Sequence, residues 1–339
     1  MSQVQSLPEV AAVFRFLVGL LVLLALAFLA TRLTEGRQLV EVLARGVPLW
    51  IIAAITFEVV LRLNQAGFLQ AVFHLFGVPL GFIRAAQLLL VNQFTSVAAP
   101  GGSLSGAAVV VAACVRQGVE PARAMIVSFV YFLMDYAAFS LVLAAAVTYL
   151  AQAQLLYPYE IWATVLLAVL VACMAALLGV ALFFPDYLQR LGRLLEGRLA
   201  RALLLRQVTY KSPITTWITE LISTVRRLRT HRQGLVRPIV FALAVQVLGV
   251  LTLASIFLAF QYPVSAAVLI AGYAVGKLFT IISITPSGIG FVEGAMTGAF
   301  VSLGVPLEAA VVVVLVYRGI NVWLPFLVGI WGMRTVAGR

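Results

Sequence analysis

Residues 285–294 read TPSGIGFVEG, and residues 99–108 read APGGSLSGAA. Each stretch places a proline and several glycines between two apolar segments, and these residues interrupt a helix. Pro100 and Pro286 stand 186 positions apart, and at that offset ten of the 32 positions from Pro100 to Tyr131 are identical. The matches at proline, glycine and tyrosine carry the most weight, because alanine and valine are abundant in this chain. The two breaks therefore belong to an internal repeat.

Each copy of the repeat has the same order of elements. An apolar helix leads to the Pro/Gly break, a short apolar helix follows, and a Gly-Val turn precedes a long helix. The turns are Gly118-Val119 and Gly304-Val305. A short helix of about 15 residues spans only about 22 Å, less than the roughly 30 Å hydrocarbon core of a bilayer. We therefore expect two broken or re-entrant helix hairpins, with repeat cores at residues 83–150 and 264–336.

The composition around these hairpins is that of a membrane protein. Of the 339 residues, 63% are hydrophobic and 10% are charged, whereas soluble domains have about 25% charged residues. Several apolar runs are near the roughly 20 residues that a membrane-spanning helix needs. These runs are 11–33, 47–63, 124–150, 161–184, 238–260 and 306–333. We expect one polytopic domain over residues 1–339, an all-α integral membrane protein with about seven or eight transmembrane segments.

The excess of basic residues is concentrated in one loop. The formal net charge is +11, and 11 of the 23 Lys and Arg residues lie between Arg190 and Arg237. Cytoplasmic loops of membrane proteins are rich in Lys and Arg. We therefore expect residues 186–237 to form a basic cytoplasmic loop, and we expect no nucleic-acid partner. Near-helical spacing of the arginines also fits an amphipathic helix lying on anionic headgroups.

The position of this loop predicts the orientation of both hairpins. Counting crossings from it, the first hairpin opens to the cytoplasm near Arg84 and Arg123, and the second opens to the other side near Gln261 and Gly304. The repeats are then inverted, which is typical of alternating-access transporters. The alternative is a duplicated scaffold without transport. We expect a bacterial cell (inner) membrane protein with both termini in the cytoplasm.

Ionisable side chains inside the predicted spans are candidate site residues, because each costs about 2.5 to 3.5 kcal/mol at the bilayer centre. Glu293 follows the second break by three residues and lies in the first turn of a helix, where a carboxylate is favourable. Arg318 lies within the last span, and we expect it to pair with Glu293. Under the repeat, Asp135 is equivalent to Asn321. Both copies therefore place a polar side chain one turn beyond the shared tyrosine.

Further charges lie in other spans. Glu58 and Lys277 are also candidates for buried polar sites. Arg15 and Arg62 are expected near helix ends, from where long basic side chains reach water. These two are therefore left out of the predicted site.

The two breaks also predict an anion site. A helix that begins after a glycine-rich break offers free backbone N–H groups and the positive end of its dipole. Two such helix starts, approaching from opposite sides, suit the phosphate of a lipid headgroup. The alternative is that the glycines only permit close helix contacts. The expected substrate-binding residues are Asn92, Pro100, Gly101, Gly102, Ser103, Asp135, Pro286, Ser287, Gly288, Gly290, Glu293 and Arg318.

The sequence contains no recognisable enzyme signature. Its two histidines and two cysteines lack metal-ligand spacing, and it has neither a nucleotide-binding loop nor a Gly-x-Ser-x-Gly elbow. We expect no enzymatic activity, no metal and no cofactor. Transport would then be uncoupled or driven by an ion or proton gradient, with Glu293 and Asp135 as proton carriers.

Two segments resemble the signatures of a known family. Residues 92–106, from Asn92-Gln93-Phe94 through Pro100-Gly101-Gly102-Ser103, and then Gly118-Val119, resemble the first signature of the lysylphosphatidylglycerol synthase transmembrane family. Residues 285–293, then Gly304-Val305 and Tyr317-Arg318, are similar to the second. The resemblance runs over nearly the whole chain and implies the flipping of aminoacylated phosphatidylglycerol between leaflets.

The resemblance has limits. The soluble aminoacyl-transferase domain of the full-length synthase is not expected here, so the resemblance does not imply synthase activity. Some versions of the first signature have an acidic residue soon after the glycines, where this chain has Leu104-Ser105-Gly106-Ala107. A carboxylate role in the first repeat is therefore not implied.

The leading hypothesis is a lipid flippase-like transporter that moves an anionic or aminoacylated glycerophospholipid between leaflets. Two alternatives stay open: translocation of a polyprenyl phosphate or lipid-linked sugar, and a non-transporting partner of a lipid-modifying enzyme. The expected partner is membrane phospholipid. A homo-oligomer and a lipid-modifying enzyme partner are also compatible with the sequence.

Overall fold

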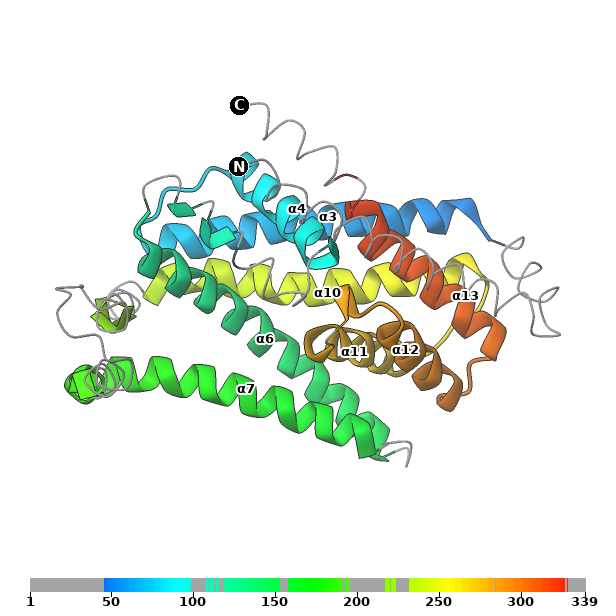
Figure 1. Ribbon diagram of the computed structural model, residues 1–339. Coiled ribbons are helices and arrows are strands. Elements are labelled where there is room, and N and C mark those ends of the chain that lie inside the picture. The colour runs from blue at the N-terminus through cyan, green and yellow to red at the C-terminus, as the bar shows by residue number, and fades with distance from the viewer. Residues whose placement is uncertain are drawn as a thin grey trace, which may run out of the picture.

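A computed structural model of the chain describes residues 46–98, 108, 110–112, 114–115, 119–152, 158–190, 193–194, 217–219, 221–223, 232–283, 285–326 and 328. Every long element in these ranges is a helix, and the helices form one elongated bundle (Figure 1). The α-helices are α3 (Pro48–Leu75), α4 (Phe82–Ala98), α6 (Pro121–Gln152), α7 (Pro158–Phe183), α10 (Val236–Ala259), α11 (Ala266–Ile282), α12 (Phe291–Ser302) and α13 (Leu307–Arg318). Short 3₁₀ turns cover Arg232–Leu235 (η1) and Pro286–Gly288 (η2), and a π-helical turn (η3, Gly319–Trp323) continues α13.

The chain is a multi-pass all-α membrane protein. Among the described residues, five helical stretches are long and apolar enough to cross a membrane. They are Pro48–Leu75, Pro121–Gln152, Thr164–Ala181, Val236–Ala259 and Leu307–Phe326. The predicted run 124–150 lies within α6, and the predicted runs 161–184 and 238–260 match α7 and α10 except for the last residue of each run. The predicted run 11–33 lies outside the described residues.

Helix α3 is longer than the sequence predicts. The apolar run ends at Leu63, whereas the helix continues to Leu75. The polar residues that follow Leu63 bond to neighbouring elements: Asn64 Nδ2 donates to the Phe241 carbonyl at 2.9 Å, and Gln70 Nε2 to the Leu80 carbonyl at 3.1 Å. Residue 62 is therefore near the middle of the helix.

Helices α3 and α10 run antiparallel along the centre of the bundle. At one end, the Val47 N–H donates to the Ala259 carbonyl at 2.8 Å, so the start of α3 meets the end of α10. At the other end, the Leu75 side chain lies against Gly234, just before α10 begins. Figure 1 shows the two helices side by side over their length.

The helices of the two repeats begin at nearly equal offsets. Helix α6 begins at Pro121 and α13 at Leu307, 186 positions later, and α4 begins at Phe82 and α11 at Ala266, 184 positions later. The antiparallel pair α3 and α10 leads into these helices, so α4 starts at one end of the bundle and α11 at the other. The two halves therefore run in opposite directions, and their orientation in a bilayer stays a prediction.

Helices α11 and α12 form a tight hairpin. Gly272 and Gly276 of α11 lie so close to Phe300 and Met296 of α12 that an added methyl group would overlap them. The start of α11 and the end of α12 line one small cavity, which includes Ser265 and Leu303. The break between the two helices therefore lies at the opposite end of the hairpin, inside the bundle.

The second break has unusual backbone geometry. Ser287, Gly288 and Gly290 have φ angles of 48°, 73° and 87°, a region in which glycine is favoured. Helix α4 ends at Ala98 and packs against the 3₁₀ turn of this break. The helix that leads to the first break therefore ends beside the second break. Pro100, Gly101, Gly102 and Ser103 lie outside the described residues.

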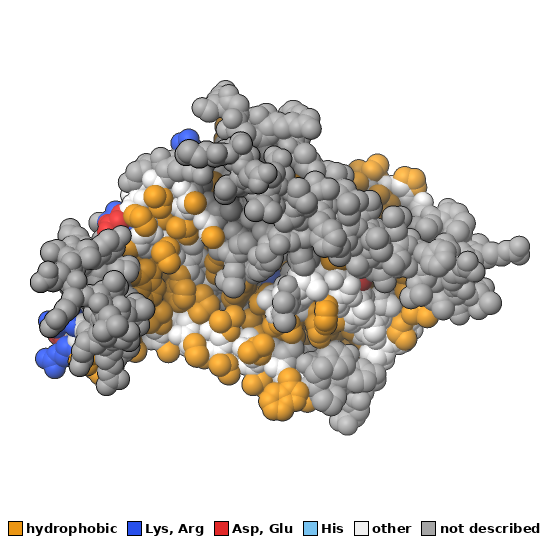
Figure 2. Space-filling model, in the orientation of Figure 1, with side chains coloured by type: hydrophobic (Ala, Val, Ile, Leu, Met, Phe, Trp, Pro, Cys, Tyr) orange, Lys and Arg blue, Asp and Glu red, His pale blue; other side chains and the backbone are white. Residues whose placement is uncertain are grey.

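The surface separates charge from apolar side chains. Arg84, Arg123 and Arg237 lie at the end where α3 finishes, and the opposite end carries no Lys or Arg in the described ranges. In Figure 2 the basic side chains gather mainly at the left edge, and hydrophobic side chains cover much of the described surface between the two ends of the bundle. The exposed apolar residues of α7 include Trp162 and Leu166. This band is suited to contact with lipid tails.

Candidate functional site

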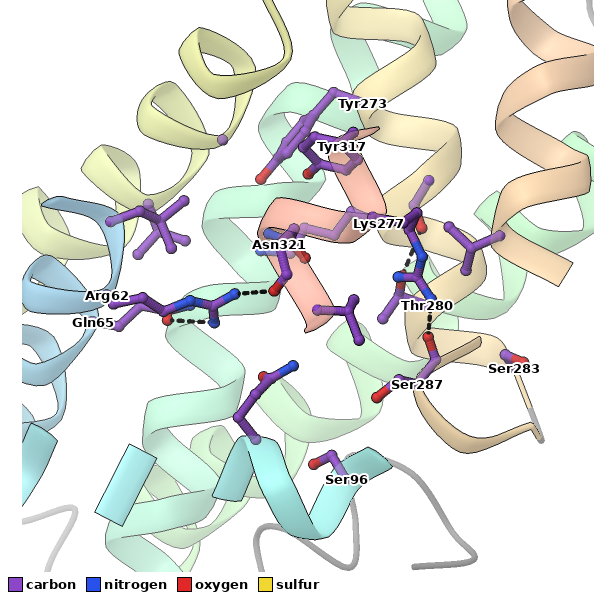
Figure 3. A pocket seen from close by; sticks show the side chains of 18 of the residues that line it. Arg62, Gln65, Ser96, Tyr273, Lys277, Thr280, Ser283, Ser287, Tyr317 and Asn321 are labelled. Carbon is purple, nitrogen blue, oxygen red and sulfur yellow. Dashed lines mark hydrogen bonds between the residues drawn. The ribbon is translucent and has the colours of Figure 1, made fainter. Parts of the chain in front are cut away.

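A polar cavity of about 230 Å³ lies where the end of α4 meets the second break. Side chains from α3, α4, α6, α10, α11 and α13 line it, and Figure 3 shows several of them turned toward one another. Stacked rings of Phe94 and Phe326, with centroids 5.1 Å apart, join α4 to the end of the last helix. The polar and charged lining residues are Arg62, Gln65, Asn92, Gln93, Ser96, Asp135, Tyr273, Lys277, Thr280, Ser283, Thr285, Ser287, Tyr317, Arg318 and Asn321.

Glu293 and Arg318 form the predicted ion pair. Arg318 Nε lies 2.7 Å from Glu293 Oε1, and both residues are buried. Arg318 Nη2 also donates to the Ser287 carbonyl at 2.6 Å, and Glu293 Oε2 accepts from the Gly290 N–H at 2.7 Å. The pair therefore holds the backbone of the second break on both sides. Its formation is confirmed.

A second ion pair joins the two repeats. Lys277 Nζ, from α11, lies 3.1 Å from Asp135 Oδ1, from α6. Gln246 of α10 connects the pair: its Nε2 donates to Asp135 Oδ1, and its Oε1 accepts from Lys277 Nζ and from the Tyr273 hydroxyl, each at 3.1 Å. The Lys277 ammonium also lies 5.2 Å from the centre of the Phe139 ring, a cation–π distance.

A third ion pair lies within α3. Arg62 Nη2 lies 2.6 Å from Glu58 Oε1 and also 2.6 Å from the Asn321 carbonyl, to which it donates. The Asn321 side chain donates to Glu58 in turn. The prediction that Arg62 reaches water from a helix end is wrong, because α3 extends a further three turns beyond it. Arg62 belongs to the cavity.

A π-helical turn prepares α13 for these contacts. It begins directly after Arg318 and contains Asn321. A π turn leaves carbonyl groups out of the regular helical pattern and recurs at functional sites. Here the Asn321 carbonyl accepts from Arg62 of α3, while Arg318 points to the second break.

Asp135 and Asn321 are equivalent under the repeat, and both line the cavity. Their partners differ, because Asp135 faces Lys277 of the other repeat whereas Asn321 faces Glu58 and Arg62. The shared position thus supplies a polar side chain to one common site from both halves.

Several predicted residues meet at the cavity. Asn92, Asp135, Ser287 and Arg318 line its wall, and Glu293 supports Arg318. Pro286, Gly288 and Gly290 belong to the second break, in which both glycines have positive φ angles. For the predicted residues of the first break, Pro100 to Ser103, the structure gives no position.

The residues that the sequence predicts for the site do not include Gln246, Tyr273 or Arg62. Gln246 is 2% exposed and bonds to three side chains of the site. It is the single amide in the apolar run 238–260, and that isolation is the signal that could have identified it. Tyr273 carries no such signal, because tyrosine is common in apolar helices.

The charges around the cavity balance. In the part of the chain that the structure describes, three acidic and three basic side chains form the three pairs. Two buried polar atoms at the cavity, Arg62 Nε and Asn92 Oδ1, have no hydrogen-bond partner among the described residues. One is a donor and the other an acceptor, so a bound group with both kinds of atom would satisfy them. The same ranges contain no cluster of His, Cys, Asp and Glu able to hold a metal ion.

Comparison with known families gives one result. The family model described as "Lysylphosphatidylglycerol synthase TM region" matches residues 16–329. No curated protein matches the chain significantly.

Proposed function

The chain belongs to the lysylphosphatidylglycerol synthase TM region family, and on this premise we propose that it moves a phospholipid headgroup between the leaflets of a membrane. The membership itself supports a role linked to membrane lipid. The sequence predicts anionic or aminoacylated glycerophospholipids as substrates. We propose the wider class of glycerophospholipids, because the site contains acidic and basic side chains in equal number. The lipid would leave chemically unchanged, so we propose a transporter and not an enzyme.

The observation that carries this proposal is the polar cavity inside a membrane-spanning bundle. Three ion pairs border a space of about 230 Å³ among apolar helices. Charged groups at such depth are costly, and they usually mark a pathway for a polar substrate. The cavity suits a headgroup but is below the roughly 300 to 1,000 Å³ of sites that enclose whole drug-sized ligands. The acyl chains would therefore stay in the lipid while the headgroup crosses.

The opposed halves support movement rather than simple binding. Helices α4 and α11 start at opposite ends of the bundle, and α4 ends beside the second break. A site between two oppositely directed hairpins can be opened to one side by one hairpin and to the other side by the second. The basic end of the bundle would face the cytoplasm of a bacterial inner membrane.

Reconstitution in liposomes tests this function. Phospholipids labelled with a fluorophore on an acyl chain would be bleached from outside by dithionite, so leaflet exchange appears as loss of the protected half. We expect protein-dependent exchange that Lys277→Met reduces and Arg84→Gln, at the exposed basic end, leaves intact. Folded protein that exchanges no phospholipid would overturn the proposal. Exchange of a labelled polyprenyl phosphate alone would support the lipid-linked sugar alternative. If no lipid is exchanged at all, the result would support a non-transporting partner of a lipid-modifying enzyme.

A further inference from the structure

The three ion pairs at the cavity differ in how fully their atoms are used. Both carboxylate oxygens of Glu293 accept hydrogen bonds, and its partner Arg318 is only 4% exposed. Glu58 is 1% exposed and accepts from Arg62 and from the Asn321 amide, whereas Arg62 itself is 24% exposed and its Nε has no described partner. Opening either pair would leave a buried charge alone, which is strongly unfavourable. The buried carboxylate of each of these two pairs therefore keeps its partner, and we call them the closed pairs.

In the Asp135–Lys277 pair, by contrast, both partners are partly exposed and both have unused hydrogen-bonding atoms. Both side chains are 18% exposed. Asp135 Oδ1 accepts from Lys277 and Gln246, whereas Oδ2 accepts no hydrogen bond from a described residue. Lys277 uses two of its three N–H groups. One acceptor and one donor of opposite charge thus remain available beside the cavity.

The charge balance of the cavity limits what can bind beside this pair. The six charged side chains cancel in the described part of the site. A guest with a net charge would leave one charge uncompensated in a region of low dielectric, whereas a net-neutral guest would not. A guest that carries one positive and one negative group can also exchange partners with an existing pair, so that every charge keeps a counter-charge throughout.

We propose, resting on the proposed function, that the preferred ligand is a phospholipid with a zwitterionic headgroup of one ammonium and one phosphate. Its phosphate binds the Lys277 ammonium, and its ammonium binds Asp135 Oδ2. The direct Asp135–Lys277 contact breaks when the headgroup enters. Gln246 holds both side chains in place during the exchange, because it bonds to each of them. The two closed pairs keep the surrounding helices and the second break in position.

Competition between lipids of different charge tests this inference. Liposomes would contain acyl-labelled phosphatidylethanolamine (net neutral), phosphatidylglycerol (net negative) or lysylphosphatidylglycerol (net positive). We expect the neutral lipid to exchange at least about tenfold faster than either charged lipid. A tenfold ratio is about 1.4 kcal/mol, which lies between the energy of an exposed ion pair and the cost of breaking a buried one. Equal rates for all three lipids would overturn the inference and leave the proposed function standing.

Two charge variants should shift the preference in opposite directions. Asp135→Asn makes the site net positive, so the exchange rate of phosphatidylglycerol should rise relative to that of phosphatidylethanolamine. Lys277→Gln makes the site net negative, so the exchange rate of lysylphosphatidylglycerol should rise relative to that of phosphatidylethanolamine. Glu308→Gln and Arg84→Gln remove one charge of each sign away from the cavity and should leave the order of lipids unchanged. A shift in the same direction for both site variants would contradict the charge-balance argument.

Lipid retention gives a readout that does not depend on transport. Purified protein equilibrated with an equal mixture of the three lipids would be analysed by native mass spectrometry, with thermal unfolding as the check of folding. Preferential retention of phosphatidylethanolamine without leaflet exchange would support the ligand and overturn the transport function. Retention in proportion to the mixture would overturn the ligand assignment.

Discussion

Arg318 links the last helix to the second break through two bonds of nearly equal length, 2.7 Å to Glu293 and 2.6 Å to the Ser287 carbonyl. The guanidinium thereby bridges the helix start and the turn that precedes it. Because Ser287 has a φ of 48°, an unfavourable angle for a residue with a side chain, the break depends on contacts of this kind. The ion pair is thus part of the architecture of the site.

The first prediction concerns this pair. Glu293→Gln and Arg318→Gln should each lower the free energy of unfolding by roughly 3 to 5 kcal/mol, because each leaves one buried charge unpaired. The double variant should lose less than the sum of the two, because it leaves no lone charge. Thermal unfolding in detergent would measure this, with Glu308→Gln as the control. Losses that add up in the double variant would show that the two side chains do not interact.

The second prediction concerns the packing of α11 on α12. Gly272→Ala should destabilise the protein by roughly 1 to 3 kcal/mol, because the new methyl group overlaps the buried ring of Phe300. Gly298→Ala is the matched control, since no atom lies near its added methyl group and alanine favours a helix over glycine by about 1 kcal/mol. Unfolding temperatures of the two variants should move in opposite directions. Equal shifts would mean that the hairpin is packed differently.

The third prediction concerns Gln246. Gln246→Leu should cost roughly 1 to 3 kcal/mol, because the buried Tyr273 hydroxyl loses its acceptor. Gln246→Leu with Tyr273→Phe should recover part of this loss, because both polar groups are then removed. Thermal unfolding of the single and double variants would decide the point. If the added Tyr273→Phe change lowers stability further, the hydroxyl has another partner that matters more.

The fourth prediction concerns the opposed ends of the bundle. In a variant in which Cys114 and Cys173 are replaced by alanine, Gly81→Cys should react with an impermeant maleimide from the cytoplasmic side, and Ala266→Cys from the other side. Both positions are exposed and precede or open a hairpin helix. Ser287→Cys, inside the bundle, should react slowly from either side. Labelling of Gly81→Cys and Ala266→Cys from the same face would refute inverted repeats.

The sequence is sufficient to predict the Glu293–Arg318 pair, for a physical reason. The proline and glycines mark where the helix restarts, so the place of Glu293 on its first turn is known. A charge in an apolar span needs a counter-charge, and Arg318 is in the neighbouring helix of the same repeat. The predicted helices follow equally from the apolar runs, because only a helix satisfies the backbone in a membrane.

The Asp135–Lys277 pair could not be predicted in this way. The two residues are 142 positions apart, in different repeats, so their contact depends on how the two halves dock. Helix periodicity carries no information about docking. For Arg62 the limit is of another kind: polar side chains after residue 63 resemble a helix end, although they bond to neighbouring helices.

The π turn at Gly319–Trp323 gives the last helix one residue more than a regular α-helix over the same rise. If the same residues formed a regular α-helix, the part of the chain after Trp323 would be rotated by about 100° relative to the part before Gly319. Arg318 could keep its hold on the second break, while Phe326 would turn away from Phe94, with which it stacks at 5.1 Å. The extra residue thus allows one helix to contact the second break through Arg318 and α4 through Phe326 at the same time. A chain with one residue fewer here would keep both contacts on a regular α-helix and would lose only the irregular carbonyl groups of the π turn.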